Sequence, residues 1–368
     1  MKKLIAVLAM VALVSGAAFA QFGGAVFGGV NLLESGTNAE GKDSINGSGG
    51  MSRLRVEGSG SSDDGAFGGW LRMEGASNYF RAPPSWASDQ SPFAGMGVDM
   101  WGYAWWKPID QFKLILGSNP DSFWGKDGYA RWMFYQVAGD VGAADAGNAW
   151  GIFSNMFWGG FGGYGALMEI TPIDILGLNI ALPYIDMSGS EVADIFEAAK
   201  LQLNVNLDFG NIALTMDGLS DAGKLFVYFG LGAVENLDLA VGFGYNLNSS
   251  LAAAGAALKF GINDSFALKF RVGADLPGKD KSSNDEEKYL GLAVDVMPII
   301  GVNDSMTAFV SLGLTVSGKD SDMEFHFNPY IQIGSEWGPS FWAGFRLWSS
   351  GNMKDMHWAV PVAINFAF

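Results

Sequence analysis

The stretch WAVPVAINFAF, from Trp358 to Phe368, decides the fold class. Every second residue from Trp358 onward is large and apolar, and the residues between them are small or polar. Successive side chains of a β-strand point to opposite faces, so this stretch predicts a strand whose two faces meet different solvents. The chain ends on an aromatic residue.

This strand resembles the C-terminal signature of bacterial outer-membrane β-barrels, in which a final aromatic residue follows apolar residues at alternate positions. The resemblance implies that the chain inserts into outer-membrane lipid. It also implies that the barrel assembly machinery reads Phe368, Phe366 and Ile364 as an assembly signal.

The N-terminus predicts export. A basic start is followed by an apolar run from Leu4 to Val14, which is too short to span a bilayer. Ala18 and Ala20 are small residues at the two positions that a signal peptidase inspects. We therefore expect a signal peptide over residues 1–20 and a barrel over residues 21–368. The chain has no cysteine, so a lipid-anchored thiol and disulfides are excluded.

The composition favours a barrel over a helical membrane protein. The chain is 49% hydrophobic with a mean hydropathy of +0.17, yet beyond the signal peptide no apolar run is long enough for a membrane helix. Only helices and closed barrels satisfy their backbone groups in lipid. The 52 Gly, 13 Trp, 10 Tyr and 27 Phe suit tight turns and aromatic girdles. A secreted soluble β-protein is the alternative, but its outward faces would be polar.

Alternating segments define the two faces of the predicted wall. In residues 199–209 the odd positions are apolar and the even positions are polar, so one face suits lipid and the other suits water. Segments 265–276 and 322–333 follow the same pattern. The side chains expected on the water-filled side include Lys200, Gln202, Asn204, Lys269, Arg271, Glu324 and His326.

Counting such segments predicts an all-β, antiparallel up-and-down barrel of about eighteen strands, among them 22–33, 50–59, 288–297 and 340–348. A count of sixteen stays open because the segment 112–118 is short and the segments 211–218 and 224–234 could be miscounted. An even count places both termini on the periplasmic side and gives short turns after even-numbered strands. The connections after odd-numbered strands include the long ones, at 34–49, 77–97, 119–162, 186–197 and 277–287.

The longest connection, residues 119–162, is rich in aromatic residues. Its length is typical of a functional loop, and its composition argues against disorder. Its place after the fifth strand resembles that of the constriction loop of bacterial porins, which folds into the barrel. The alternative is a loop that caps the mouth or covers a neighbouring protomer. If the loop folds into the barrel, its acidic residues face the pore; they are Asp121, Asp127, Asp140 and Asp145.

Charged residues alternate with apolar ones on the second and third strands. Arg53, Arg55 and Glu57 share one face of the second strand, and Arg72 and Glu74 share one face of the third. Charges that line a pore decide which ions and polar solutes pass, so this basic wall opposite the acidic loop predicts a charge filter. In the alternative, each arginine pairs with Glu57 or Glu74 and only reinforces the wall.

The leading functional prediction is a passive outer-membrane porin for small hydrophilic solutes or ions. A non-conducting adhesin or structural barrel and a hydrophobic-solute transporter are the alternatives. The net charge of −16 becomes −18 without Lys2 and Lys3, which excludes nucleic acid as a partner. His326 and His357 are the two histidines, and no nucleophile is expected to converge on either, so no enzyme, metal or cofactor is predicted. The porin resemblance implies a homotrimer.

Overall fold

A computed structural model describes residues 21–37, 43–77, 97–118, 164–183, 192–219, 223–247, 252–276, 291–317, 322–334, 339–350 and 352–367. The predicted signal peptide with Ala18 and Ala20, the loop 119–162 with its four aspartates, and Phe368 lie outside these residues. The predictions for those segments therefore stay predictions.

The described chain is almost entirely β-strand, with one short helix, α4 (Val192–Glu197). The strands are β1 (Gln21–Thr37), β2 (Asp43–Ser61), β3 (Phe67–Ser77), β4 (Gly97–Ile109), β5 (Phe112–Ser118), β6 (Tyr164–Ile173), β7 (Leu176–Pro183), β8 (Lys200–Leu207), β9 (Gly210–Asp217), β10 (Lys224–Val234), β11 (Leu237–Asn246), β12 (Ala252–Asn263), β13 (Phe266–Leu276), β14 (Gly291–Asn303), β15 (Met306–Ser317), β16 (Asp322–Gly334), β17 (Ser340–Gly344), β18 (Arg346–Ser350) and β19 (Asp355–Ala367). Among the described residues, no helix is long and apolar enough to cross a membrane.

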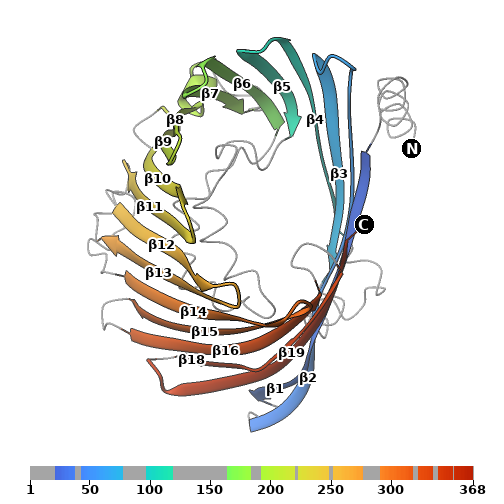
Figure 1. The fold of residues 1–368 in the computed structure, drawn as a ribbon, viewed down its shortest axis with the longest axis vertical. Coiled ribbons are helices and arrows are strands. Elements are labelled where there is room, and N and C mark those ends of the chain that lie inside the picture. The colour runs from blue at the N-terminus through green and yellow to red at the C-terminus, as the bar shows by residue number, and fades with distance from the viewer. Residues whose placement is uncertain are drawn as a thin grey trace.

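The strands form one closed antiparallel sheet. Each strand from β1 to β16 pairs with its neighbours along the chain, and β1 also pairs with β19, so that the first and last strands meet (Figure 1). The closing register sets Ala25 opposite Ala367 and Val30 opposite Val362. The all-β antiparallel barrel that alternation predicts is therefore confirmed.

β17 and β18 are two halves of one spanning strand, because both pair with β16 on one side and β19 on the other. The break falls at Phe345, opposite Pro329 of β16, which has no N–H to donate. The Phe345 N–H still donates to the Pro329 carbonyl at 2.9 Å. Alternation predicts an unbroken strand over 340–348 and does not detect this break. Counting the pair as one gives eighteen spanning strands in the described part of the chain.

Two predicted boundaries are wrong. The expected connection 34–49 is mostly strand, because β1 continues to Thr37 and β2 begins at Asp43. The Gly-, Ser- and Asn-rich sequence before Met51 shows no alternation, but it pairs with β1 through two register shifts. β14 spans Gly291–Asn303 rather than 288–297, since the run MPII after Val296 hides its period.

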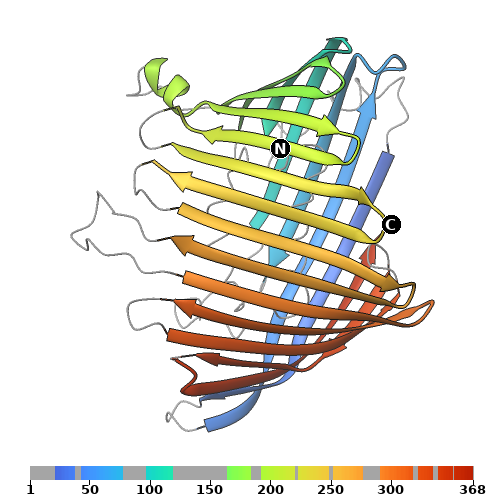
Figure 2. The same ribbon diagram turned by 60° about the vertical axis from the view of Figure 1, so that its left-hand side comes forward.

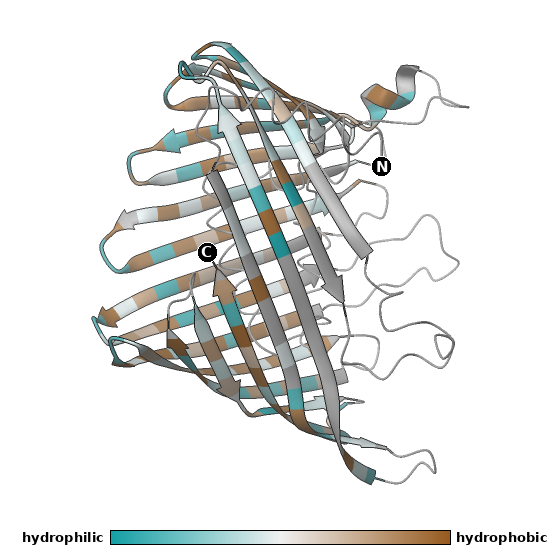
Figure 3. Cartoon of the chain, turned by 90° about the vertical axis from the view of Figure 1, so that its right-hand side faces the viewer, coloured by the Kyte–Doolittle hydropathy of each residue, from teal (hydrophilic) through white to brown (hydrophobic). Residues whose placement is uncertain are grey.

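Exposure alternates along the strands as the sequence predicts. On β19, Ile364 is 60% exposed and lies on the outer face, whereas its neighbour Ala363 is 2% exposed and lies on the inner face. On β8, Leu203 is 38% exposed and Gln202 is 1% exposed. Figure 3 shows the resulting alternation of apolar and polar residues along the strands. The outer face is therefore apolar.

Short turns join the strands at one end of the sheet (Figure 2). The repeated sequence Asn-Asp-Ser forms two of them in the same way. The Asn263 side-chain oxygen accepts the Ser265 N–H at 2.9 Å, and Asn303 accepts the Ser305 N–H at 2.9 Å. The repeat is thus shared turn chemistry.

Candidate functional site

The backbone register places the predicted charged residues of β2 and β3 on one face. Arg55 lies opposite Glu74 and Glu57 lies opposite Arg72, while Arg53 lies opposite Phe27 of β1. This is the inner face, because the intervening Val56 is exposed on the outside. The backbone register alone places Arg53 and Glu74.

One carboxylate holds two arginines. The Arg72 Nε donates to Glu57 Oε1 at 2.7 Å, and the Arg55 Nε lies 3.4 Å from the same oxygen. The Arg72 side chain is 16% exposed and that of Glu57 is 30% exposed. Partly exposed pairs contribute little stability. The arrangement instead fixes two guanidinium groups beside one carboxylate, and the register places a second carboxylate residue, Glu74, opposite Arg55.

An aromatic stripe, formed by Trp70, Tyr103 and Trp105, continues from this trio along the inner face. The Arg72 Cζ lies 4.9 Å from the centroid of Trp70. The Trp70 and Tyr103 rings are 5.3 Å apart, and the Tyr103 and Trp105 rings are 6.1 Å apart. The Lys113 Nζ lies 5.4 Å from the centroid of Trp105. A cation therefore flanks the stripe at each end.

A glycine and a small apolar cluster support the stripe. A Cβ at Gly68 would lie 2.0 Å from the Trp105 ring, so the indole occupies the space that any other residue would fill. Buried Ile115, Leu167 and Ala181 pack against Tyr103 and Trp105. Periodicity alone gives no sign of this packing, because it depends on contacts across five strands, β3 to β7.

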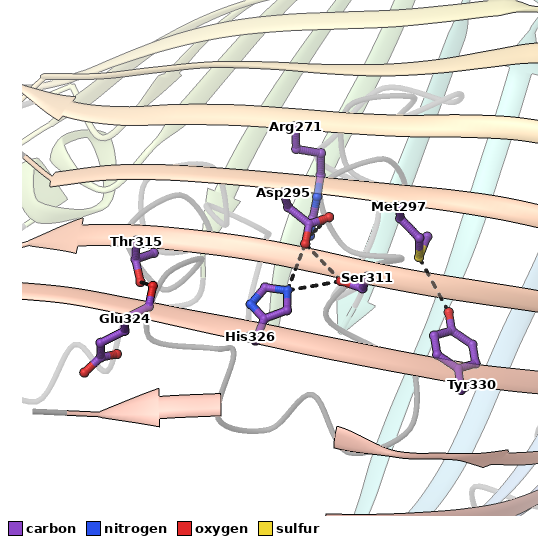
Figure 4. A network of polar contacts seen from close by, with 8 residues as sticks. All are labelled: Arg271, Asp295, Met297, Ser311, Thr315, Glu324, His326 and Tyr330. Carbon is purple, nitrogen blue, oxygen red and sulfur yellow. Dashed lines mark hydrogen bonds and ion pairs between the residues drawn. The ribbon is translucent and has the colours of Figure 1, made fainter. Parts of the chain in front are cut away.

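A second polar cluster, the Asp295 network, lies on β13 to β16 (Figure 4). The Arg271 Nη2 lies 3.3 Å from Asp295 Oδ1. The other carboxylate oxygen, Oδ2, accepts the Ser311 hydroxyl at 3.0 Å and lies 2.9 Å from His326 Nε2. Arg271 and Asp295 are 1% and 0% exposed. Lumen-facing Arg271 was predicted to line the pore, but its charge is instead buried and paired with a carboxylate.

Gly313 lets His326 reach Asp295. In the register, Gly313 of β15 lies between Asp295 of β14 and His326 of β16. A Cβ at Gly313 would lie 2.0 Å from His326 Cε1. The imidazole therefore lies over the bare backbone of β15 and connects two strands that are not neighbours.

Ser311, His326 and Asp295 meet, contrary to the expectation that no nucleophile converges on a histidine. Their geometry is not that of a nucleophilic triad, however. Ser311 Oγ and Asp295 Oδ2 lie 3.1 Å and 2.9 Å from the same nitrogen, Nε2, whereas a triad uses opposite ring nitrogens for the serine and the carboxylate. The contacts join strands rather than activate a hydroxyl.

The inner face of β7 to β9 is polar, but its side chains are not exposed to water at every position. Gln202 accepts from Asn179 at 3.1 Å and from Asn204 at 3.0 Å, and it donates to Thr215 at 3.0 Å. The predicted water-facing positions Gln202 and Asn204 are buried, so that part of the prediction is wrong. The Gln202 amide is satisfied at both its oxygen and its nitrogen, whereas Asn204 Oδ1 has no hydrogen-bond partner among the described residues.

The predicted lysines lie on the inner face. Lys200 of β8 is opposite Ala181 and Asp217, and Lys269 of β13 is opposite Lys259 and Met297. Both lysines are partly exposed and make contacts with other residues. Their placement matches the predicted register.

Aromatic residues also gather on another part of the inner face, where the sequence predicts no site. Phe309 and Tyr330 stack at 4.7 Å, and Tyr330 and Trp342 lie 5.6 Å apart. The Arg346 Cζ lies 4.4 Å from the centroid of Trp348. Tyr330, Trp342 and Arg346 are buried, unlike the stripe. These residues carry inward parity in the sequence, but only the register brings them together.

Known proteins share this fold. Residues 6–327 match the family model described as Gram-negative porin. The fold is similar to that of Acinetobacter baumannii OccAB4, with a TM-score of 0.58 and 9% identity over 95% of this chain and 98% of that chain. Pseudomonas aeruginosa OpdK, solved with vanillate, gives 0.57 and 8% over 95% and 98%. The Salmonella typhi OmpF complex with daunomycin gives 0.51 and 10% over 95% and 97%. No curated protein matches the chain.

Proposed function

The chain belongs to the Gram-negative porin family and is an outer-membrane diffusion channel, and we propose that the basic trio on β2 and β3 is its charge filter. The observation that carries the proposal is the shared carboxylate: Arg55 and Arg72 both contact Glu57 Oε1 and all three side chains keep some exposure. The solutes are small and hydrophilic, and anions are favoured.

The charge count of the wall supports this preference. On β2 and β3, Arg53, Arg55 and Arg72 share the inner face with Glu57 and Glu74, which leaves one cation in excess on these two strands. Asp99 of β4 lies opposite Glu74. A guanidinium group stays charged at every accessible pH. The excess acts on a passing solute at short range, whereas exposed charges beyond about 8–10 Å are screened at physiological salt. A locally basic wall is therefore compatible with a net charge of −16.

The test is the reversal potential of single channels in a planar bilayer under a KCl gradient. Replacing Arg53, Arg55 and Arg72 with Gln should shift permeability toward cations, more at low ionic strength than at high. Lys354→Gln, in the exposed turn before β19, removes a cation away from the trio and should leave the reversal potential unchanged. An unchanged reversal potential in the triple variant would mean that the two glutamates neutralise the arginines and that the filter lies elsewhere.

The same experiment separates the alternatives. A correctly inserted barrel that never conducts KCl would contradict the diffusion channel and favour the adhesin or the hydrophobic-solute transporter. We propose no catalytic role, because the fold and family are those of channels and because Ser311 and Asp295 contact the same ring nitrogen of His326.

Further features complete the proposal. We infer that the loop 119–162, which follows β5, folds into the pore and sets Asp121, Asp127, Asp140 and Asp145 opposite the basic trio. We also infer a homotrimer. Its support is the resemblance of the loop position to that in porins.

Export and assembly are part of the same proposal. We infer that residues 1–20 are cleaved as a signal peptide after Ala20 and that the assembly machinery reads β19 through Phe368, Phe366 and Ile364. The outward exposure of Phe366 and Ile364 supports the second inference, because it leaves the apolar face of β19 available for recognition.

A further inference from the structure

We propose that the end of the barrel with the short turns is a collar that binds phospholipid headgroups with a primary ammonium group and disfavours anionic headgroups. The collar consists of seven described turns and the outward apolar residue beside each turn. The turns are 62–66, 110–111, 174–175, 208–209, 235–236, 264–265 and 304–305 (Figure 2). The inference goes beyond the charge filter, and it rests on the periplasmic placement of the short turns.

Each of the seven turns carries at least one exposed carboxylate, and none of them contains Lys or Arg. The acidic residues are Asp63, Asp64, Asp110, Asp174, Asp208, Glu235, Asp264 and Asp304. Lys107 of β4 offsets one of them through an ion pair with Asp110 at 2.7 Å. Lys259 of β12 also lies near this end, but on the inner face opposite Asp238. Since Asp and Glu are ionised at neutral pH, the collar is negatively charged.

A large apolar side chain lies beside the carboxylate of every turn. These side chains are 48% to 58% exposed, and they are Phe67, Ile109, Ile173, Phe209, Val234, Ile262 and Val302. Val302 shares its parity on β14 with Ile300, which is 40% exposed on the outer face. Phe209 continues the outer series of β8, to which Leu203 belongs. The apolar outer face therefore extends to the edge of the barrel and meets the carboxylates there.

Shifts of register turn three of these apolar residues outward. On β4 the even positions face outward, as the exposed Trp106 shows, so strict alternation would turn Ile109 inward. The register shifts between Trp106 and Ile109, and Ile109 pairs with Phe112. The same kind of shift precedes Ile173 and Val234. The arrangement of an outward apolar residue next to a carboxylate is thus kept even where alternation alone would lose it.

This pairing of groups matches the boundary between acyl chains and headgroups. The apolar side chain can lie against the acyl chains while the neighbouring carboxylate reaches the headgroup layer. A primary ammonium group has three N–H donors and forms charge-assisted hydrogen bonds with a carboxylate. A choline headgroup has no N–H donor on its nitrogen, and a glycerol headgroup leaves the phosphate charge uncompensated, so that the carboxylates repel it. Ethanolamine headgroups therefore fit the collar best.

A soluble basic protein is the other partner that a ring of carboxylates could attract. Such a partner would need only the charges. The outward apolar residue at all seven turns is instead continuous with the lipid-facing surface of the barrel, which favours phospholipid as the occupant.

The experiment measures which headgroup gathers around the protein. The purified barrel is reconstituted in phosphatidylcholine vesicles with spin-labelled phospholipids that carry ethanolamine, choline or glycerol headgroups, and electron spin resonance gives the association of each with the protein. Ethanolamine should exceed glycerol by about 1.4- to 5-fold, the range of one exposed ion pair. The difference should shrink in about 1 M KCl, where charges are screened beyond about 3 Å.

A quadruple variant removes four carboxylates: Asp174→Asn, Asp208→Asn, Asp264→Asn and Asp304→Asn. Asn keeps the size of the side chain and is favoured in turns, so the barrel should fold while the ratio of ethanolamine to glycerol falls toward one. Asp355→Asn is the control, because Asp355 is also exposed but lies at the other end of β19 with inward parity. This control should keep the ratio of the unmodified protein.

Equal association of the three headgroups with the unmodified barrel, or a preference for glycerol, would overturn the collar and leave its carboxylates to a soluble cationic partner. An unchanged ratio in the quadruple variant would overturn it as well. If that variant does not fold, the salt dependence of the unmodified protein decides, and a preference that survives high salt contradicts the proposal. None of these results depends on KCl conduction, so the charge filter stands or falls separately.

Discussion

Replacing Gly313 with Ala should destabilise the barrel, although this change within a strand normally does not. The new Cβ would lie 2.0 Å from Cε1 of His326 and 2.6 Å from Nδ1 and Nε2. Real Cβ atoms do not approach other atoms so closely, so the imidazole must leave its place over β15. It then loses its contacts with Asp295 and Ser311, at 2.9 Å and 3.1 Å.

The cost follows from what remains around Asp295. The carboxylate keeps Arg271 and Ser311 but loses one of three partners while it stays buried. A hydrogen bond to a charged group contributes about 1.5–3 kcal/mol, so the free energy of unfolding should fall by about that amount. Gly177→Ala is the control, because its Cβ would meet Asn204 at an ordinary 3.7 Å. That change should be neutral or stabilise by up to about 1 kcal/mol.

The assay is reversible urea unfolding in lipid vesicles, followed by tryptophan fluorescence. The Gly313→Ala midpoint should fall with an unchanged slope, and the Gly177→Ala midpoint should not. A double-mutant cycle with His326→Ala isolates the mechanism, since Gly313→Ala should cost little once the imidazole is absent. If Gly313→Ala costs the same in both backgrounds, the imidazole is not the reason for the glycine.

Three further predictions test other parts of the molecule. Ile364→Asp puts a charge on the lipid face, where a charge near the midplane costs about 2–4 kcal/mol, with acids at the lower end. In cell fractionation this variant should fail to reach the outer membrane, whereas Asn206→Asp on the inner face should assemble normally. Deleting residues 129–148 should raise single-channel conductance without unfolding the barrel, and an unchanged conductance would place that loop outside the pore. The pKa of Asp64 is held below its usual 3.8 by the Ser62 hydroxyl, which donates to the carboxylate at 2.6 Å, and by a backbone N–H. The contacts of Asp64 within the turn should therefore persist above pH 3.8 and be lost as the pH falls through the lowered pKa. NMR titration of the turn amides should show this loss, and Asp64→Asn should abolish the transition.

The faces of the strands could be predicted from the sequence, and the ends of several could not. Alternation indicates that the two faces of a strand meet different solvents, so it assigns the side chains of β8 and β19 to the correct faces. Where both faces carry Gly, Ser and Asn, as at the start of β2, the period vanishes and only pairing with β1 extends the strand. The break at Phe345 depends on Pro329 across the sheet, which local sequence does not contain.

The candidate site was predicted in composition but not in contacts. Parity placed Arg55, Glu57 and Arg72 on the inner face, and the predicted alternative of pairing with Glu57 is what the two described arginines do. The Asp295 network was missed because its members come from four strands and meet only in the correct register. Gly313 gave no signal, since a glycine in a strand has many explanations.

The seam between β1 and β19 has a consequence for the time course of folding. It sets Ala25 opposite Ala367, so the closing ladder joins the two ends of the described chain. Loop-closure entropy must be overcome before such distant contacts form, which makes this step slow. Until then both strands are open edges that can pair with other chains. A nascent chain therefore needs protection from aggregation throughout its synthesis, and no shortened version that lacks β19 can close along this seam.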